Sequence, residues 1–225
     1  IVPGVVAVAL IVWFIKADGP VPSMRTQPLW SLRGFDARLI GFLLVIGLFS
    51  LGNSSNAFLI LKAEHVGVSP AWISGLYLAF NATYALLTVP AGILADRFGP
   101  KKMILCGFVL FAMVYAGFAL ATSVWQIAGL FISYGLYMGV ADGVQRAYLA
   151  TLIRTEQKAT GFGLYHMVVG LAILPASLLA GFLWDRVGPA APFAFGAMMA
   201  TLAALAFVWL IRKDARTFDP LQSIR

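Results

Sequence analysis

Long apolar stretches separated by short charged connections dominate this sequence. A helix needs about 20 apolar residues to cross the hydrocarbon core of a membrane. Charged residues make up only 11% of the chain and hydrophobic residues 61%, whereas about a quarter of the residues of a soluble domain are charged. Lipid must therefore cover most of the surface. We expect an all-α integral membrane protein with spans at residues 1–15, 39–61, 71–95, 103–122, 126–150, 161–183 and 191–211.

The basic residues lie almost entirely on one side of the expected membrane. All but two of the 16 Lys and Arg residues, Lys62 and Arg186, fall in alternate connections or at the C-terminal end. The positive-inside rule makes that side cytoplasmic, so we expect a multi-pass protein of the cell (inner or plasma) membrane with a cytoplasmic C-terminus. The same scattering of basic residues excludes nucleic acid as a partner, because nucleic-acid binding requires basic residues clustered on one surface.

Residues 17–37 form a polar connection rich in proline and glycine, and we expect them to be a cytoplasmic linker. The span before this linker is short, and the chain opens on Ile1 inside an apolar run. We expect residues 1–16 to be the last transmembrane helix of an N-terminal bundle that lies outside this sequence. Residues 38–213 would then form a six-helix bundle, followed by a cytoplasmic tail at residues 214–225.

Two segments of the six-helix region resemble each other. Residues 91–100 and 180–189 are identical at seven of ten positions, at an offset of 89 residues. Three expected crossings separate the two copies, so the copies would face opposite sides of the membrane. Three helices followed by three inverted helices is the repeat pattern of many secondary transporters. The alternative is that both segments merely share ordinary helix-end chemistry.

Residues 92–102, with the sequence Gly-Ile-Leu-Ala-Asp-Arg-Phe-Gly-Pro-Lys-Lys, resemble the cytoplasmic loop signature of the major facilitator superfamily (MFS). Pro100 departs from the pattern, which usually has a basic residue there. The resemblance implies an MFS-type six-helix C-terminal bundle with a 3+3 inverted repeat, preceded by one extra transmembrane helix, the sixth of the family. It also implies a gating loop formed by Gly92, Asp96, Arg97, Gly99 and Lys101. A gating salt bridge of Asp96 and a static loop cap are both open interpretations.

Polar residues are unevenly shared among the expected spans. The spans at 1–15, 103–122 and 191–211 carry almost none and should face lipid, whereas the other four should face protein or an aqueous cavity. The run from Gly52 to Asn56 is polar near mid-membrane and favours local unwinding. Either substrate contact or hydrogen bonding between helices explains these polar groups. The candidate cavity residues are Asn53, Asn56, Tyr77, Asn81, Tyr84, Tyr134 and Gln145.

Asp142 is the most informative residue, because a carboxylate inside a span costs several kcal/mol unless it is paired or hydrated. Asp142 and Arg146 are four residues apart on one helix and can form an ion pair. His166 is expected at a depth similar to that of Asp142 on the next helix. We consider two interpretations: a structural bridge, and a proton-coupling site that consists of Asp142, Arg146 and His166.

The leading hypothesis is a secondary active transporter that moves a small organic solute by alternating access. The family resemblance makes proton coupling and efflux the favoured variant. The sequence shows no catalytic constellation, no metal-ligand cluster and no nucleotide-binding loop, so we expect neither an enzyme nor a cofactor. The expected partners are a small-molecule substrate, the lipid bilayer and the N-terminal bundle. The alternative is a non-transporting polytopic membrane protein, such as a receptor or an assembly partner.

Overall fold

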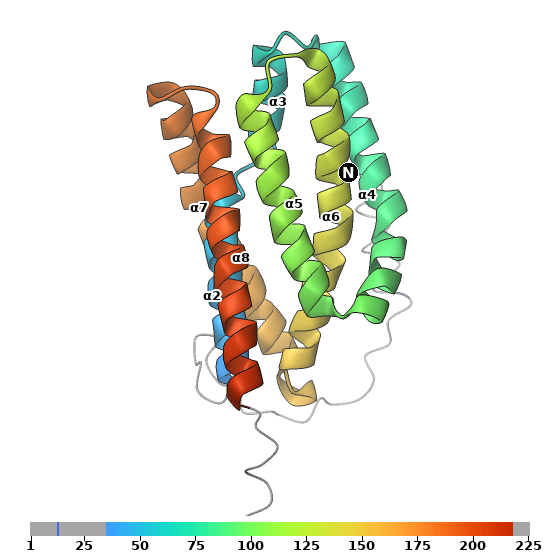
Figure 1. Cartoon of the computed structure of the whole chain (residues 1–225), viewed down its shortest axis with the longest axis vertical. Coiled ribbons are helices and arrows are strands. Elements are labelled where there is room, and N and C mark those ends of the chain that lie inside the picture. The colour runs from blue at the N-terminus through green and yellow to red at the C-terminus, as the bar shows by residue number, and fades with distance from the viewer. Residues whose placement is uncertain (1–12, 14–34, 218–225) are drawn as a thin grey trace, which may run out of the picture. The chain divides into compact units, whose positions relative to one another are not determined.

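The computed structural model describes residue 13 and residues 35–217, and all regular secondary structure in that part is helical (Figure 1). Six segments of the described part are long and apolar enough to cross a membrane, which confirms the last six expected spans. The expected first span and most of the expected linker lie outside the described residues. The helices are α2 (Ala37–Gly52), α3 (Ala57–His65), α4 (Pro70–Phe98), α5 (Pro100–Leu120), α6 (Val124–Leu152), η1 (Thr155–Gln157), α7 (Lys158–Arg186) and α8 (Ala191–Thr217).

Local capping chemistry sets the ends of these helices. The carboxylate of Asp36 accepts a hydrogen bond of 2.9 Å from the backbone N–H of Arg38 and caps the start of α2. Ser123 and Gln126 form a reciprocal capping box at the start of α6. Gly99, with a φ of +90°, makes the tight turn between α4 and α5, because a residue without a Cβ adopts this conformation at little cost.

Neighbouring helices pack as long, nearly parallel rods (Figure 1). The helix α6 packs mainly against α4 and α5, whereas α8 packs mainly against α2 and α5. The span expected at 39–61 consists of two helices, α2 and α3, with residues 53–56 outside both. This confirms the unwinding expected at the polar run after Gly52.

Aromatic side chains fill the centre of the bundle. Phe49 lies between Phe108 and Phe111, with both ring centroids at 4.8 Å. Tyr115 stacks on Phe111 at 3.9 Å, and Phe193 of α8 contacts Tyr115 edge to face at 5.6 Å. Each buried aromatic side chain removes a large area from lipid and fixes its neighbours by shape. This cluster holds α2, α5, α6 and α8 together.

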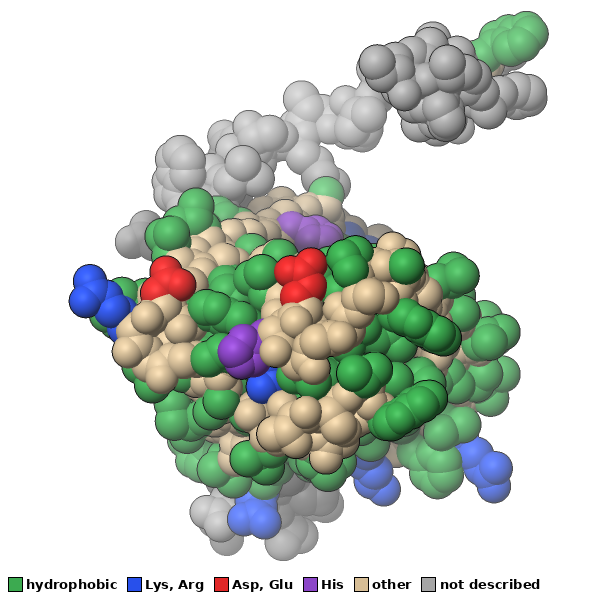
Figure 2. Space-filling model, turned by 90° about the horizontal axis from the view of Figure 1, so that it is seen from above, with side chains coloured by type: hydrophobic (Ala, Val, Ile, Leu, Met, Phe, Trp, Pro, Cys, Tyr) green, Lys and Arg blue, Asp and Glu red, His purple; other side chains and the backbone are tan. Residues whose placement is uncertain are grey.

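The structure corrects one expectation about the lipid-facing helices. The span at 103–122 was expected to face lipid, but one side of α5 is buried in the aromatic cluster, including Tyr115 at 1% exposure. Its other side, which includes Val109 and Met113, is exposed and apolar. The sequence contained no strong periodic signal here, because both sides of the helix are hydrophobic. Seen from the end at which α3 ends and α4 begins, mostly hydrophobic and uncharged side chains cover the bundle (Figure 2).

Candidate functional site

The break between α2 and α3 exposes polar backbone inside a membrane span. A Cβ on Gly52 would lie 2.5 Å from the Cβ of Met199, so glycine allows α8 to pass close to the end of α2. The freed N–H of Ser55 donates to the Oγ of Ser177 on α7, at 3.3 Å. The amide oxygen of Asn56 accepts from the hydroxyl of Tyr134 on α6, at 2.9 Å. Partners on two other helices therefore bind one backbone N–H and one side chain of the break.

A row of polar side chains follows one face of α4. Asn81 donates to the carbonyl oxygen of Tyr77 at 2.7 Å, and the Thr88 hydroxyl donates to the carbonyl oxygen of Tyr84 at 2.7 Å. Asn81 and Thr88 are exposed, and Tyr77 and Tyr84 are half-buried. These side chains therefore form a polar surface within a helix that is long and apolar enough to cross the membrane.

Asp142 lies at the centre of a three-residue network that joins α4 and α6. Its Oδ2 atom accepts hydrogen bonds from the Tyr84 hydroxyl, at 3.0 Å, and from the Arg146 guanidinium, at 2.5 Å. The side chains of Asp142 and Arg146 are 31% and 46% exposed, so the pair is reachable from outside the bundle. The i, i+4 ion pair expected from the sequence is confirmed. Tyr84 is a third partner whose contact the sequence did not predict.

Two glycines of α6 allow this network to form. A Cβ on Gly139 would lie 2.9 Å from the Cβ of Leu87 and 3.3 Å from the carbonyl oxygen of Tyr84. A Cβ on Gly135 would lie 2.5 Å from the carbonyl oxygen of Phe80. Small residues four positions apart let two helix backbones approach closely. This approach brings the hydroxyl of Tyr84 within reach of Asp142.

Tyr134 and Gln145 were expected on the cavity surface, and the structure corrects this expectation. Both are buried, at 1% and 6% exposure. Tyr134 stacks on Phe80 with ring centroids 5.3 Å apart, and Gln145 accepts a hydrogen bond of 3.2 Å from the hydroxyl of Tyr165 on α7. Polar residues near the middle of a span satisfy one another between helices, and the sequence could not distinguish that role from cavity lining.

His166 is exposed on α7 and contacts the ring of its neighbour Tyr165 edge to face, at 5.3 Å. Across residues 35–217, the hydrogen bonds and ion pairs of Asp142 are with Tyr84 and Arg146, and none joins Asp142 to His166. A proton relay between His166 and Asp142 therefore stays a prediction, and it would require an intervening water molecule or substrate group.

The residues of the expected gating loop lie in the last turns of α4, at Gly99 and in the first turn of α5. Gly92, Asp96 and Arg97 are exposed, and the Arg97 guanidinium lies 5.7 Å from the ring centroid of Phe98. Lys101 lies 4.0 Å from a carboxylate oxygen of Asp214 at the end of α8. Asp96 forms no ion pair with any residue of the described part. The bundle therefore leaves Asp96 available to a partner outside it.

The polar helices α4 and α7 are the least covered of the six spans. In the most apolar stretch of α4 and of α7, only 17% of the residues are buried, compared with 44% in the corresponding stretches of α5 and α6. Asn53, Asn56, Asn81, Tyr84 and Asp142 all keep some exposure. Hydrogen bonds join α6 to Tyr84 of α4, to Tyr165 of α7 and to Asn56 in the break after α2.

Six helices that are long and apolar enough to cross a membrane define a multi-pass helical membrane protein. The sequence profile described as Major Facilitator Superfamily matches residues 40–223, and the chain therefore belongs to that superfamily. This confirms the family resemblance of the loop at residues 92–102.

Three relatives show what this chain is similar to. An uncharacterized MFS-type transporter of Methanocaldococcus jannaschii is 35% identical over 205 residues, which cover 88% of this chain and 51% of that protein. The class C tetracycline resistance protein of Escherichia coli is 29% identical over 161 residues, 67% of this chain and 40% of that protein. A multi-drug resistance efflux pump, the PmrA homolog of Lactococcus lactis, is 28% identical over 189 residues, 80% and 45% of the two chains. The chain spans about half the length of these relatives or less.

Proposed function

We propose that this chain forms one bundle of a secondary active transporter that moves a small organic solute by alternating access. The observation that carries the proposal is the paired carboxylate of Asp142, reachable from outside the bundle and joined to a polar face of α4. An ionised group within a membrane span is costly, and a purely structural ion pair would be better shielded. A second bundle placed against this polar surface would enclose an aqueous cavity.

The second bundle belongs to the same protein in our proposal. Residues 1–16 would be its last helix, and residues 17–37 would be the cytoplasmic linker. The protein would lie in the plasma membrane with its C-terminus in the cytoplasm. The bias of Lys and Arg supports this orientation, and the fraction of relatives that the chain spans is consistent with two bundles. Uncovered helices such as α4 and α7 are the ones that a second bundle would contact.

A 3+3 inverted repeat is part of the same proposal. The two similar segments both place a glycine with positive φ at the end of the motif, Gly99 at +90° and Gly188 at +132°. Each glycine turns the chain between two long helices. The gating loop would use one copy: Asp96 and Arg97 are exposed and would pair with the second bundle when the cytoplasmic side closes.

Proton coupling would use the network of Asp142, Arg146 and Tyr84. In the ionised state Asp142 binds the guanidinium of Arg146 and the hydroxyl of Tyr84. Protonation of Asp142 removes the charge that attracts Arg146, so the guanidinium becomes available to substrate or to the second bundle. His166 is the proposed further proton carrier, and Asn53, Asn56, Tyr77 and Asn81 are the proposed substrate contacts. The similarity to a tetracycline resistance protein and a multi-drug efflux pump favours export.

Everted membrane vesicles that contain the full-length protein test this proposal. A respiratory substrate acidifies the vesicle interior and quenches an acridine dye, and a solute exchanged for protons restores the fluorescence. We expect a member of a panel of small organic solutes to restore it for the wild type and for Glu64→Gln, an exposed position at the end of α3. Asp142→Asn should give no recovery. Equal recovery in Asp142→Asn would remove Asp142 as the coupling residue.

A further inference from the structure

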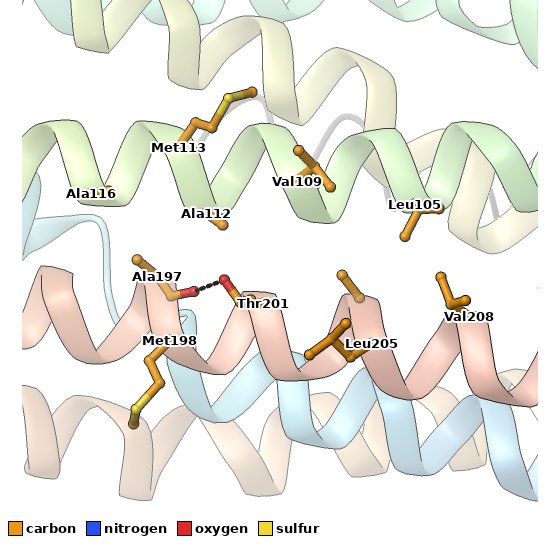
Figure 3. Close-up of a pocket in the computed structure, with 11 residues that line it drawn as sticks. Leu105, Val109, Ala112, Met113, Ala116, Ala197, Met198, Thr201, Leu205 and Val208 are labelled. Carbon is orange, nitrogen blue, oxygen red and sulfur yellow. Dashed lines mark hydrogen bonds between the residues drawn. The ribbon is translucent and has the colours of Figure 1, made fainter.

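An apolar groove runs along the exposed side of α5 and α8 (Figure 3). Leu105, Val109 and Ala116 line it from α5, and Ala197 and Leu205 line it from α8. Its volume is about 590 Å³. The one hydroxyl in its lining, that of Thr201, donates to the carbonyl oxygen of Ala197 at 2.8 Å. The groove therefore offers hydrocarbon contact and demands no hydrogen bond from an occupant.

A second apolar groove follows the opposite flank of α5, between α5 and α6. It has a volume of about 540 Å³ and shares Leu105, Val109 and Met113 with the first groove. These three side chains thus form a ridge with one groove on each side. Lys102 lines the second groove, one turn before Leu105.

The length of the first groove matches one leaflet of a bilayer. Leu105 and Ala116 are eleven residues apart on one helix, which corresponds to roughly 16 Å of helix rise. The hydrocarbon core is about 30 Å thick, so a single leaflet contributes about half of that. A straight acyl chain of one leaflet therefore has the length of the groove, whereas a helix of a partner protein would extend far beyond it.

Basic residues gather at one end of both grooves. Lys101 and Lys102 lie in the first turn of α5, and Arg212 and Lys213 lie near the end of α8. The ion pair between Lys101 and Asp214, at 4.0 Å, brings these two helix ends together. Asp214 is 16% exposed and also pairs with Arg38. Among the described residues, Lys101, Lys102 and Arg212 therefore outnumber Asp214, the one carboxylate that forms an ion pair at these helix ends.

The start of α5 adds to this positive potential. Gly99 and Pro100 precede the lysines, and no side chain of the described part caps the helix. The first amides of α5 and its helix dipole therefore favour an anion at the same place as Lys101 and Lys102. Lys213 packs on the ring of Trp209 at 5.3 Å, a combination typical of a membrane interface.

We propose that α5 and α8 form a binding site for an anionic glycerophospholipid. Its two acyl chains would lie in the two grooves, one on each side of the ridge of Leu105, Val109 and Met113. Its phosphate would lie at Lys102 and Arg212, beside the start of α5. One headgroup with two chains matches one basic cluster with two grooves. The site is distinct from the polar network of Asp142, and it requires neither transport activity nor a substrate.

Native mass spectrometry of the full-length protein in a neutral detergent tests this site. The protein is titrated with phosphatidylglycerol or with phosphatidylcholine of the same acyl chains. We expect one molecule of phosphatidylglycerol to bind to each protein molecule, with a higher affinity than phosphatidylcholine has. The double variant Lys102→Gln/Arg212→Gln should weaken phosphatidylglycerol binding about 30-fold, since each basic residue near an anionic lipid contributes about fivefold. Its binding of phosphatidylcholine should not change.

Matched controls separate the headgroup from the grooves. Arg154→Gln/Lys158→Gln removes two exposed cations, one from the connection after α6 and one from the first turn of α7, and should leave binding unchanged. Ala116→Phe fills the first groove and should weaken both lipids, whereas Ala194→Phe, exposed on α8 outside the groove, should weaken neither. Equal affinity of the wild type for both lipids would overturn the proposal. So would an equal loss in the control double variant, or displacement of phosphatidylglycerol by glycerol 3-phosphate alone.

Discussion

Replacing Gly135 by alanine tests the close contact of α4 and α6 on which the Asp142 network depends. The new Cβ would lie 2.5 Å from the carbonyl oxygen of Phe80 and 2.9 Å from the Cβ of Thr83, whereas ordinary contacts begin at 3.4 Å. Backbone cannot rotate away as a side chain can, so α4 must move outward by most of an ångström. Overpacking of this kind costs about 1–3 kcal/mol.

Gly143 on the same helix is the matched control, because a Cβ there would meet nothing within 4 Å. Both substitutions gain about 1 kcal/mol of helix propensity, so the difference between the two variants isolates the overpacking cost. We expect the free energy of unfolding of Gly135→Ala to be about 1–3 kcal/mol lower than that of Gly143→Ala. Circular dichroism of the full-length protein during titration with a denaturing detergent measures this difference. Equal stability of the two variants would refute the packing argument.

Three further substitutions test other parts of the fold. Gly99→Ala should lose about 1–3 kcal/mol of stability because of its φ of +90°, whereas Gly75→Ala, which has open space around it, should lose none; thermal unfolding in detergent compares them. Tyr134→Phe removes the hydrogen bond to Asn56 and should lower the free energy of unfolding by about 0.6 kcal/mol. Asn56→Ala removes the same bond and should lower it by at least as much. Unchanged stability in both variants would contradict this. Asp214→Asn breaks two partly exposed ion pairs, so its cost should stay below about 1 kcal/mol and disappear in 1 M salt; a cost unchanged by salt would contradict this.

The sequence predicted the spans well, because length and hydropathy determine them almost alone. The expected span at 126–150 became α6 (Val124–Leu152), and that at 161–183 became α7 (Lys158–Arg186). The longer observed helices include polar end residues, which hydropathy excludes but caps and turns permit. The break after Gly52 was also predictable, since consecutive asparagine and serine side chains compete for backbone hydrogen bonds.

The site was harder to predict, because it depends on how the helices rotate against each other. The pair of Asp142 and Arg146 is local, and its i, i+4 spacing was enough to predict it. The contact with Tyr84 is 58 positions away in sequence and depends on the glycines of α6. Burial of Tyr134 likewise follows from aromatic neighbours on other helices. No periodic pattern within one span carries that information.

Cysteine labelling of the polar face of α4 tests the central claim most directly, and it needs no knowledge of the substrate. In a full-length background without other cysteines, which includes Cys106→Ser, a single cysteine is placed at Asn81 or, as the control, at Met113 on the exposed apolar side of α5. Reaction with a charged, membrane-impermeant maleimide reports water at each position. We expect Asn81→Cys to react and Met113→Cys to stay unlabelled. If Asn81→Cys is as unreactive as Met113→Cys, α4 lines no aqueous pathway and the proposed transport function is contradicted.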